Sequence, residues 1–127
     1  MQTENKIKNS IKWISELMTT DEKQTSNKLG NREVGFCCLG LGCYTLDLDY
    51  QWDDPLEPAF TESVGLLTAN GAPMGNPVTR VGSLKSLAVY NDSIRKPFSE
   101  IGEILKDNAT AYFQKDVAEG INKHFNK

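Results

Sequence analysis

The stretch that decides the fold runs from Phe36 to Leu48 and reads FCCLGLGCYTLDL. It is apolar over most of its length, so hydrophobic periodicity alone does not separate a buried helix from a buried strand. Its length favours a helix, because strands of globular proteins are usually shorter. Gly40 and Gly42 would let this helix approach a neighbouring backbone closely.

Helical patterns lie on both sides of this stretch. In the N-terminal segment, apolar side chains recur at helical spacing at Ile7, Ile11, Ile14 and Met18, with Trp13 and Leu17 beside them. Near the C-terminus, Phe113, Val117, Ile121 and Phe125 follow one another at steps of four residues. Both segments are therefore expected to be amphipathic helices that bury one face.

Two further helices are expected between residues 83 and 107. Ser83 suits the N-cap of a helix that carries Leu87 and stops at Asn91-Asp92. Pro97 suits the first turn of the next helix, because its missing N–H has no partner there in any case.

The segments that remain are polar or rich in turn residues. Residues 19–31 have the composition of a loop, with a short strand leading into Phe36 as an option. Residues 50–80 contain all the prolines but one, and only the range from Phe60 to Leu67 resembles a short helix. We therefore predict a mainly α fold with a small irregular or short β-hairpin middle section (α+β), in which residues 1–127 form a single compact domain.

Composition and charge exclude several classes of protein. The chain is 24% charged and 39% hydrophobic, as ordinary globular proteins are, and its formal net charge of -3 provides no general attraction to nucleic acid or an anionic membrane. No apolar stretch approaches the roughly 20 residues that span a bilayer, and the N-terminus lacks the apolar core of a signal peptide. We expect a cytoplasmic protein, and an odd number of closely spaced cysteines agrees with a reducing compartment.

The cysteines and the single histidine do not form a recognisable reactive or metal site. Cys37, Cys38 and Cys43 lack Cys-x-x-Cys spacing, and His124 lies almost at the C-terminus, so no metal ligand is predicted. The same placement makes a Ser/His or Cys/His catalytic pair improbable. We expect Cys37 and Cys38 to be buried packing residues.

Other motifs are incomplete. Gly40-Leu41-Gly42 lacks the third glycine of a dinucleotide fingerprint. The acidic range 47–57 has Trp52 and Pro58 where a calcium loop needs glycine and glutamate. A helix-turn-helix over 83–107 would present Glu100 and Glu103 to phosphates. No catalytic residue and no cofactor is predicted, and a small hydrolase or transferase that uses acidic residues stays as an alternative.

A binding site is the remaining option. Guanidinium and ammonium groups beside aromatic rings suit an anionic, planar ligand such as a nucleotide. The alternative is that these residues are ordinary surface charges and core aromatics. The candidate ligand-binding residues are Arg32, Tyr44, Trp52, Arg80, Lys85, Tyr90 and Arg95, with Lys96 as a further cation in the same surroundings.

A set of residues spread over most of the chain carries a family resemblance. It comprises Trp13, Leu17, Gln24, Leu29, the Phe-Cys-Cys-Leu-Gly block 36–40, Leu87, Asn91, Asp92 and the Phe-Ser-Glu-Ile-Gly block 98–102. On these residues the chain resembles a family of small, uncharacterised bacteriophage and prophage proteins. It departs from the family pattern at Leu41-Gly42, where the family usually has a second apolar residue and a small residue. It also departs at Gly102, where the family tends to have alanine.

The resemblance implies a phage protein that acts in the host cell cytoplasm. By analogy with other small phage proteins, it predicts a non-enzymatic accessory factor that counters a host anti-phage system. Its most concrete form would sequester a nucleotide-derived immune signal, and the alternative within binding is direct inhibition of a host defence or metabolic protein. Expected partners are thus an anionic nucleotide-like molecule or a host protein, and nucleic acid and membranes are not expected. A homo-oligomer is plausible, because a small helical unit can cover an apolar stripe with a second copy.

Overall fold

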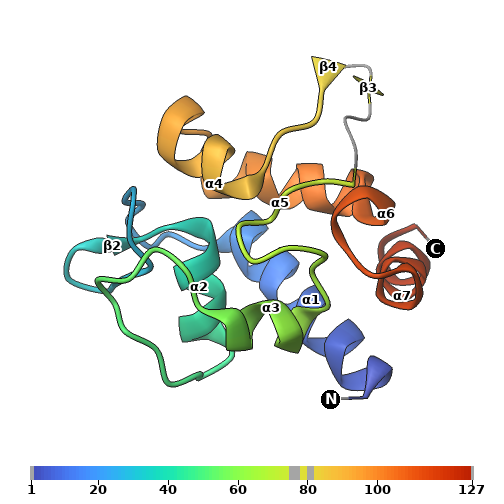
Figure 1. Ribbon diagram of the computed structural model, residues 1–127, viewed down its shortest axis with the longest axis horizontal. Coiled ribbons are helices and arrows are strands. Elements are labelled where there is room, and N and C mark those ends of the chain that lie inside the picture. Colours follow the sequence, from blue (N-terminus) through green and yellow to red (C-terminus); the bar gives the residue numbers. More distant parts are fainter. Residues whose placement is uncertain (1, 75–77, 80–81, 127) are drawn as a thin grey trace.

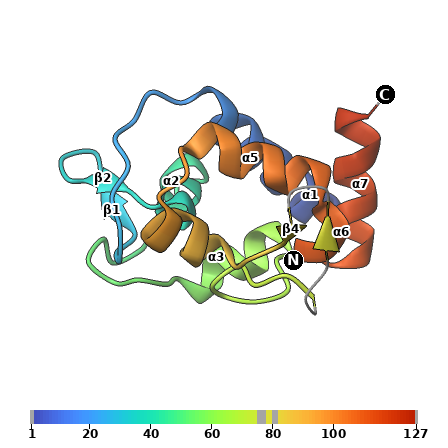
Figure 2. The same cartoon turned by 90° about the horizontal axis from the view of Figure 1, so that it is seen from above.

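Helix α1 (Thr3–Thr19) is the element against which most of the fold packs. Helices α2, α3, α5 and α7 all contact it, and Figures 1 and 2 show α5 lying beside α1. The computed structural model describes residues 2–74, 78–79 and 82–126. The described elements are α1, β1 (Gly30–Asn31), β2 (Gly35–Phe36), α2 (Cys38–Thr45), α3 (Pro58–Val64), β3 (Val78–Thr79), β4 (Gly82–Ser83), α4 (Leu87–Val89), the π-helix η1 (Tyr90–Ile94), α5 (Phe98–Asp107), α6 (Ala109–Tyr112) and α7 (Lys115–Phe125).

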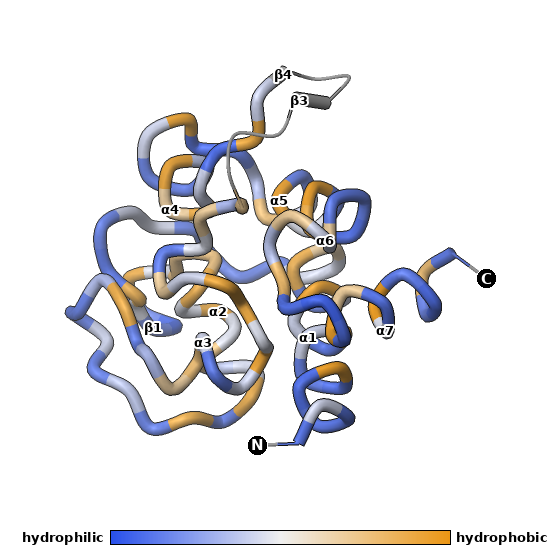
Figure 3. The backbone as a smooth tube through the Cα atoms, turned by 45° about the vertical axis from the view of Figure 1, so that its right-hand side comes forward, coloured by the Kyte–Doolittle hydropathy of each residue, from blue (hydrophilic) through white to orange (hydrophobic). Residues whose placement is uncertain are grey.

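The predicted fold class is confirmed: the chain forms a mainly helical single domain with short antiparallel β-ribbons. In the first ribbon Gly30 pairs with Phe36 and Asn31 with Gly35. The second ribbon, β3–β4, projects from the helices (Figures 1 and 3). Figure 3 also shows hydrophobic and hydrophilic residues alternating along α1, α5 and α7, as amphipathic helices require.

The core is centred on aromatic side chains that come from distant parts of the sequence. Trp13 is fully buried, and its ring lies edge-on to Phe60 at 4.8 Å and to Phe113 at 6.3 Å between centroids. Its indole N–H donates a hydrogen bond to the carbonyl of Cys38 at 2.9 Å. Trp13 therefore joins α1 to α2, α3 and the junction between α6 and α7.

Helix α2 confirms the helical interpretation of the stretch 36–48. Its N-cap is Cys37, whose sulfur accepts a hydrogen bond from the Gly40 N–H at 3.3 Å. A side chain at Gly40 would overlap the carbonyl of Leu29, and one at Gly42 would overlap the Phe60 ring. The predicted close approach to a neighbouring backbone is thus confirmed for Gly40, whereas Gly42 makes room for an aromatic side chain.

Two details of residues 83–97 differ from the prediction. The N-cap of α4 is Ser86, whose hydroxyl accepts from the Val89 N–H at 3.2 Å, and Ser83 belongs to β4. The helix begins later because Ser83 pairs with Val78 in the β3–β4 ribbon, and the carbonyl of Gly71 accepts a hydrogen bond from the Leu87 N–H at the new start. It also does not stop at Asn91-Asp92 but continues as η1 until Arg95 adopts a left-handed conformation.

The buried side chain of Asn91 ties three segments together. Its amide nitrogen donates to the Thr25 carbonyl and to Asp92, both at 2.8 Å. Its amide oxygen accepts from Gln24 at 2.8 Å and from the Cys38 N–H at 3.0 Å. The whole hydrogen-bonding capacity of the amide is used, so the polar loop before β1, the start of α2 and η1 are fixed relative to one another.

Replacing Asn91 by alanine should lower the free energy of unfolding by about 2–4 kcal/mol, because the Cys38 N–H and the Thr25 carbonyl would lose their shared partner. Urea denaturation followed by circular dichroism measures this. Asn5→Ala on the exposed surface of α1 is the control, with an expected change within about 0.5 kcal/mol. Equal effects of the two substitutions would contradict the role assigned to Asn91.

Gly40→Ala should destabilise the protein by about 3 kcal/mol, because the added methyl group meets the backbone carbonyl of Leu29, which cannot rotate away. Gly120→Ala on α7 is the matched comparison, since its methyl group meets only the Ile7 side chain. Both substitutions gain the same helix propensity. Thermal unfolding should therefore place Gly40→Ala well below Gly120→Ala, and the reverse order would overturn this explanation.

Candidate functional site

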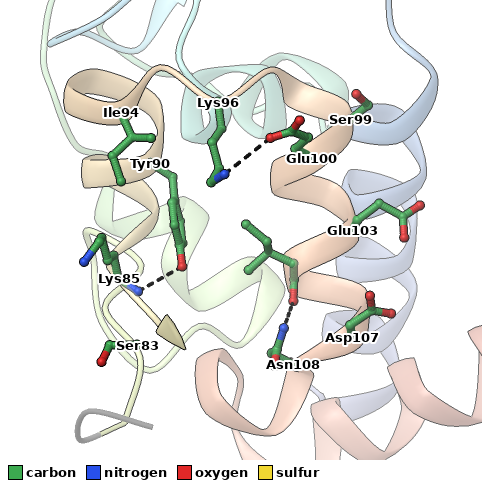
Figure 4. Close-up of a pocket in the computed structure, with 11 residues that line it drawn as sticks. Ser83, Lys85, Tyr90, Ile94, Lys96, Ser99, Glu100, Glu103, Asp107 and Asn108 are labelled. Carbon is green, nitrogen blue, oxygen red and sulfur yellow. Dashed lines mark hydrogen bonds and ion pairs between the residues drawn. The ribbon is translucent and has the colours of Figure 1, made fainter. Parts of the chain in front are cut away.

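A pocket of about 570 Å³ lies between η1 and α5 (Figure 4). Ser83 and Lys85, in the segment that leads from β4 into α4, line one end of it. Tyr90 and Ile94 of η1 form one wall, and the facing wall belongs to α5. Its position therefore depends on the π-helix, a helix type that is rare and frequently found at functional sites.

Hydrogen bonds to the backbone of Lys85 hold the tyrosine that forms one wall of the pocket. Tyr90 is 5% exposed, and its hydroxyl accepts from the backbone N–H of Lys85 at 3.0 Å. The hydroxyl of Tyr112, which is fully buried, donates to the Lys85 carbonyl at 2.6 Å. Burial raises the pKa of Tyr112 well above its usual value, and the neighbouring Tyr90 raises it further. The Tyr112 phenol thus stays neutral and keeps its hydrogen bond to Lys85.

The two lysines that line the pocket have different surroundings. The Lys96 ammonium lies 3.4 Å from a carboxylate oxygen of Glu100 and 5.9 Å from the centroid of the Tyr90 ring. Lys85 is exposed, and its ammonium makes no ion pair with any residue that the structure describes. Figure 4 shows the Lys85 ammonium on the side of Tyr90 that faces away from α5, so Lys96 is the lysine whose ammonium lies beside the Tyr90 ring.

The α5 wall contributes carboxylates as well as apolar surface. Glu100, Glu103 and Asp107 all line the pocket. Figure 4 shows Glu100 pointing toward Lys96, whereas Glu103 and Asp107 point away from Tyr90, toward the outer side of α5. Glu103 also forms an ion pair with Lys106 at 2.9 Å. The carboxylates therefore lie at the edge of the pocket. Ile104 adds apolar surface to the same wall.

The structure brings only part of the predicted ligand-binding set together. Lys85 and Tyr90 line this pocket with Lys96, whereas Arg95 ends η1 and is exposed outside it. Nothing in the sequence selected Ile104 or the carboxylates of α5 as site residues, because helical spacing places them on one helix without showing what faces it. The hydrophobic pattern of α5 was the only signal that pointed there.

The other predicted residues lie elsewhere. Arg32 pairs with Glu22 at 3.2 Å in the turn between β1 and β2. Trp52 is 44% exposed, and the ammonium of Lys28 lies 5.7 Å from its ring centroid. Arg80 lies outside the described residues. These residues do not join the pocket between η1 and α5.

Tyr44 lines a second, separate groove of about 620 Å³ between α1 and the end of α2. Its ring packs on Phe36 with 5.0 Å between centroids. Lys12, Glu16 and Asp47 line the same groove, so its charges are mixed.

The prediction that the cysteines are buried is confirmed for all three. Burial raises the pKa of Cys37 to about 11 and that of Cys43 to about 12, and it also raises the pKa of Cys38. Among the described residues, no group of three His, Cys, Asp or Glu side chains is arranged to hold a metal ion.

Comparisons with known proteins add no relative: no protein-family model, no curated protein and no solved structure matches the chain significantly. The resemblance to phage proteins therefore stays a prediction. Within the described ranges, no helix has both the length and the apolar character needed to cross a lipid bilayer.

The three thiols should react slowly with a thiol reagent in the native protein at pH 8. A pKa of about 11 leaves on the order of one thiolate in a thousand at Cys37, and burial blocks access to the sulfur. The thiolate fraction should rise only as the pH approaches these raised pKa values. A reagent that releases a coloured group when it reacts with a thiol lets the reaction be followed by absorbance. The same protein in denaturant is the control. Rapid native labelling would contradict the buried arrangement.

Proposed function

We propose that this protein is a non-enzymatic binding protein that holds a small nucleotide-like ligand in the pocket between η1 and α5. One observation carries the proposal: the Tyr90 ring forms a wall with the Lys96 ammonium 5.9 Å from its centroid and with Lys85 at the end of the same pocket. An aromatic face supports a planar base, and an ammonium group attracts a phosphate.

The state of the polar groups supports binding in preference to chemistry. The Tyr90 hydroxyl already accepts from the Lys85 N–H, and the Lys96 ammonium is paired with Glu100. Groups committed to such partners orient a ligand, whereas a general acid or base must be free to exchange a proton with it. The pocket is thus suited to retaining a molecule without changing it.

The biological setting follows from the resemblance stated above, by analogy. A phage protein of this kind would act in the host cytoplasm, where sequestering a nucleotide-derived immune signal counters an anti-phage system. Sequestration requires a stoichiometric protein–ligand complex and no turnover.

Direct inhibition of a host protein is the second candidate, and a separate surface favours it. Trp52 and Leu56 are partly exposed on the acidic segment 47–57. Backbone hydrogen bonds hold this segment to the loop before β1, since the N–H groups of Leu29 and Gly30 donate to Asp54 and Trp52 at 2.7 Å each. An exposed tryptophan on a backbone that is fixed by hydrogen bonds is the kind of residue that anchors protein interfaces.

Native mass spectrometry tests the proposal. The protein incubated with the small-molecule fraction of a bacterial lysate should gain a ligand-sized mass, and denaturation should release that ligand chemically unchanged. Lys96→Ala should lower the occupied fraction about fivefold, because it removes the ammonium group beside the Tyr90 ring. Lys8→Ala, an exposed lysine of α1 that does not line the pocket, is the matched control and should leave occupancy unchanged.

Three results would count against this function. Recovery of an altered molecule would establish an enzyme. Equal losses in Lys96→Ala and Lys8→Ala would move binding away from the pocket. No mass increment, together with capture of a host protein that Trp52→Ala abolishes, would favour the protein inhibitor.

A further inference from the structure

We infer that the exposed surface of residues 51–56 docks a basic segment of a partner protein, with Trp52 as the anchoring side chain. Such a segment carries arginine or lysine beside apolar residues. The inference rests on the second candidate of the proposed function, protein inhibition, and does not depend on the pocket between η1 and α5. In Figure 1 the connection from α2 to α3, which contains these residues, runs as a loop along the outside of the molecule.

The surface of residues 51–56 contains two large apolar side chains that the fold does not bury. All six of its residues are exposed, Trp52 and Leu56 among them. Neither of these two side chains packs against the hydrophobic core. The apolar residues just before them in the same connection do so, namely Leu46, Leu48 and Tyr50. Apolar surface therefore becomes available to a partner at Trp52, where the chain leaves the core.

Backbone hydrogen bonds fix the turn that presents Trp52. The Asp54 N–H donates to the Gln51 carbonyl at 3.1 Å and closes the turn. The hydrogen bonds from Leu29 and Gly30 tie the turn to the start of β1. Every residue type supplies a carbonyl, so none of these bonds needs an indole at position 52. Docking accounts for the large aromatic side chain there, and a fixed backbone lowers the entropy that binding costs.

The surroundings of Trp52 are acidic, and this selects the charge of the partner. Asp53 and Asp54 follow it directly, and neither carboxylate forms an ion pair with a residue that the structure describes. Between positions 33 and 79 the sequence has seven Asp or Glu residues and no Lys or Arg. This part of the chain repels an anionic partner such as nucleic acid, whereas arginine and lysine side chains find unpaired carboxylates on it.

The contact between Lys28 and Trp52 shows which chemical group the indole accepts. The Lys28 ammonium lies 5.7 Å from the centroid of the Trp52 ring, a distance at which the ring face attracts a cation. A guanidinium group from a partner can stack on an indole in the same way and reach a carboxylate with its N–H groups. Leu56 adds apolar contact beside it. An alternation of arginine and apolar residues fits this arrangement.

Fluorescence anisotropy with labelled synthetic peptides tests the inference. The probe is a short peptide in which arginine and leucine alternate. One comparison peptide has citrulline, the uncharged analogue of arginine, at the same positions, and another has glutamate. The arginine peptide should bind at least about tenfold more tightly than the citrulline peptide at low salt, and added salt should reduce this difference.

Intrinsic fluorescence locates the bound peptide. The chain has two tryptophans, of which Trp13 is fully buried. A shift of the emission to shorter wavelength on addition of the arginine peptide therefore reports that Trp52 has lost contact with water. The shift should be absent in Trp52→Phe. Binding without any shift would place the peptide elsewhere and contradict the role of Trp52 as anchor.

Two variants separate the anchor from the charge. Trp52→Ala should weaken binding of the arginine peptide at least about tenfold. The double variant Asp53→Asn, Asp54→Asn should weaken it about three- to fivefold. The matched control is Asp116→Asn, Glu119→Gln, which changes the net charge equally through two exposed residues of α7, on the opposite side of the molecule in Figure 1. The control should leave the affinity unchanged.

The outcomes distinguish this inference from both candidate functions. Equal binding of the arginine and glutamate peptides, or equal losses in the two double variants, would overturn docking of a basic segment. Spermidine that binds as tightly as the arginine peptide would assign the surface to a free polyamine and overturn a protein partner. A host protein whose capture needs Trp52 but not Asp53 and Asp54 would keep protein inhibition and overturn the basic partner. Lys96→Ala should leave peptide binding unchanged, so the pocket is tested separately.

Discussion

The hydrogen bonds of one buried amide, that of Asn91, determine how the main parts of this protein meet. The amide lies at the junction of the loop before β1, the start of α2 and the π-helix η1, and each of its polar atoms is used. Burying such a group is favourable only when every partner is in place. The three segments must therefore adopt their positions together.

The same junction extends into the pocket. Gln24, which donates to the Asn91 amide, also donates to the Lys96 carbonyl at 2.8 Å. Lys96 follows the left-handed residue that ends η1, and its side chain lines the pocket. The polar loop before β1, which does not line the pocket, thus helps to hold one of its cations. A surface loop, a buried asparagine and one wall of the pocket are thus connected by hydrogen bonds.

Most of the helices were predictable because each has a local signature. The apolar stripe of α1, the length of the stretch that contains α2 and the four-residue steps of α7 all reflect the helical period. The end of the helix after Leu87 was not predictable, because Asn91 and Asp92 usually terminate helices. Here their side chains bond to distant segments, and the backbone continues as a π-helix.

The sequence by itself determined the helical class and the buried cysteines, since these follow from local periodicity and side-chain size, whereas the need for glycine at position 40 comes from the packing of Leu29 against it. Only the tertiary structure decided which charged residues share a site. Lys85 and Tyr90 line one pocket with residues of α5, an arrangement that no spacing along the chain encodes, whereas Arg32, Tyr44 and Trp52 lie on other surfaces. Local patterns report which face of a helix is buried, and long-range packing sets what that face meets.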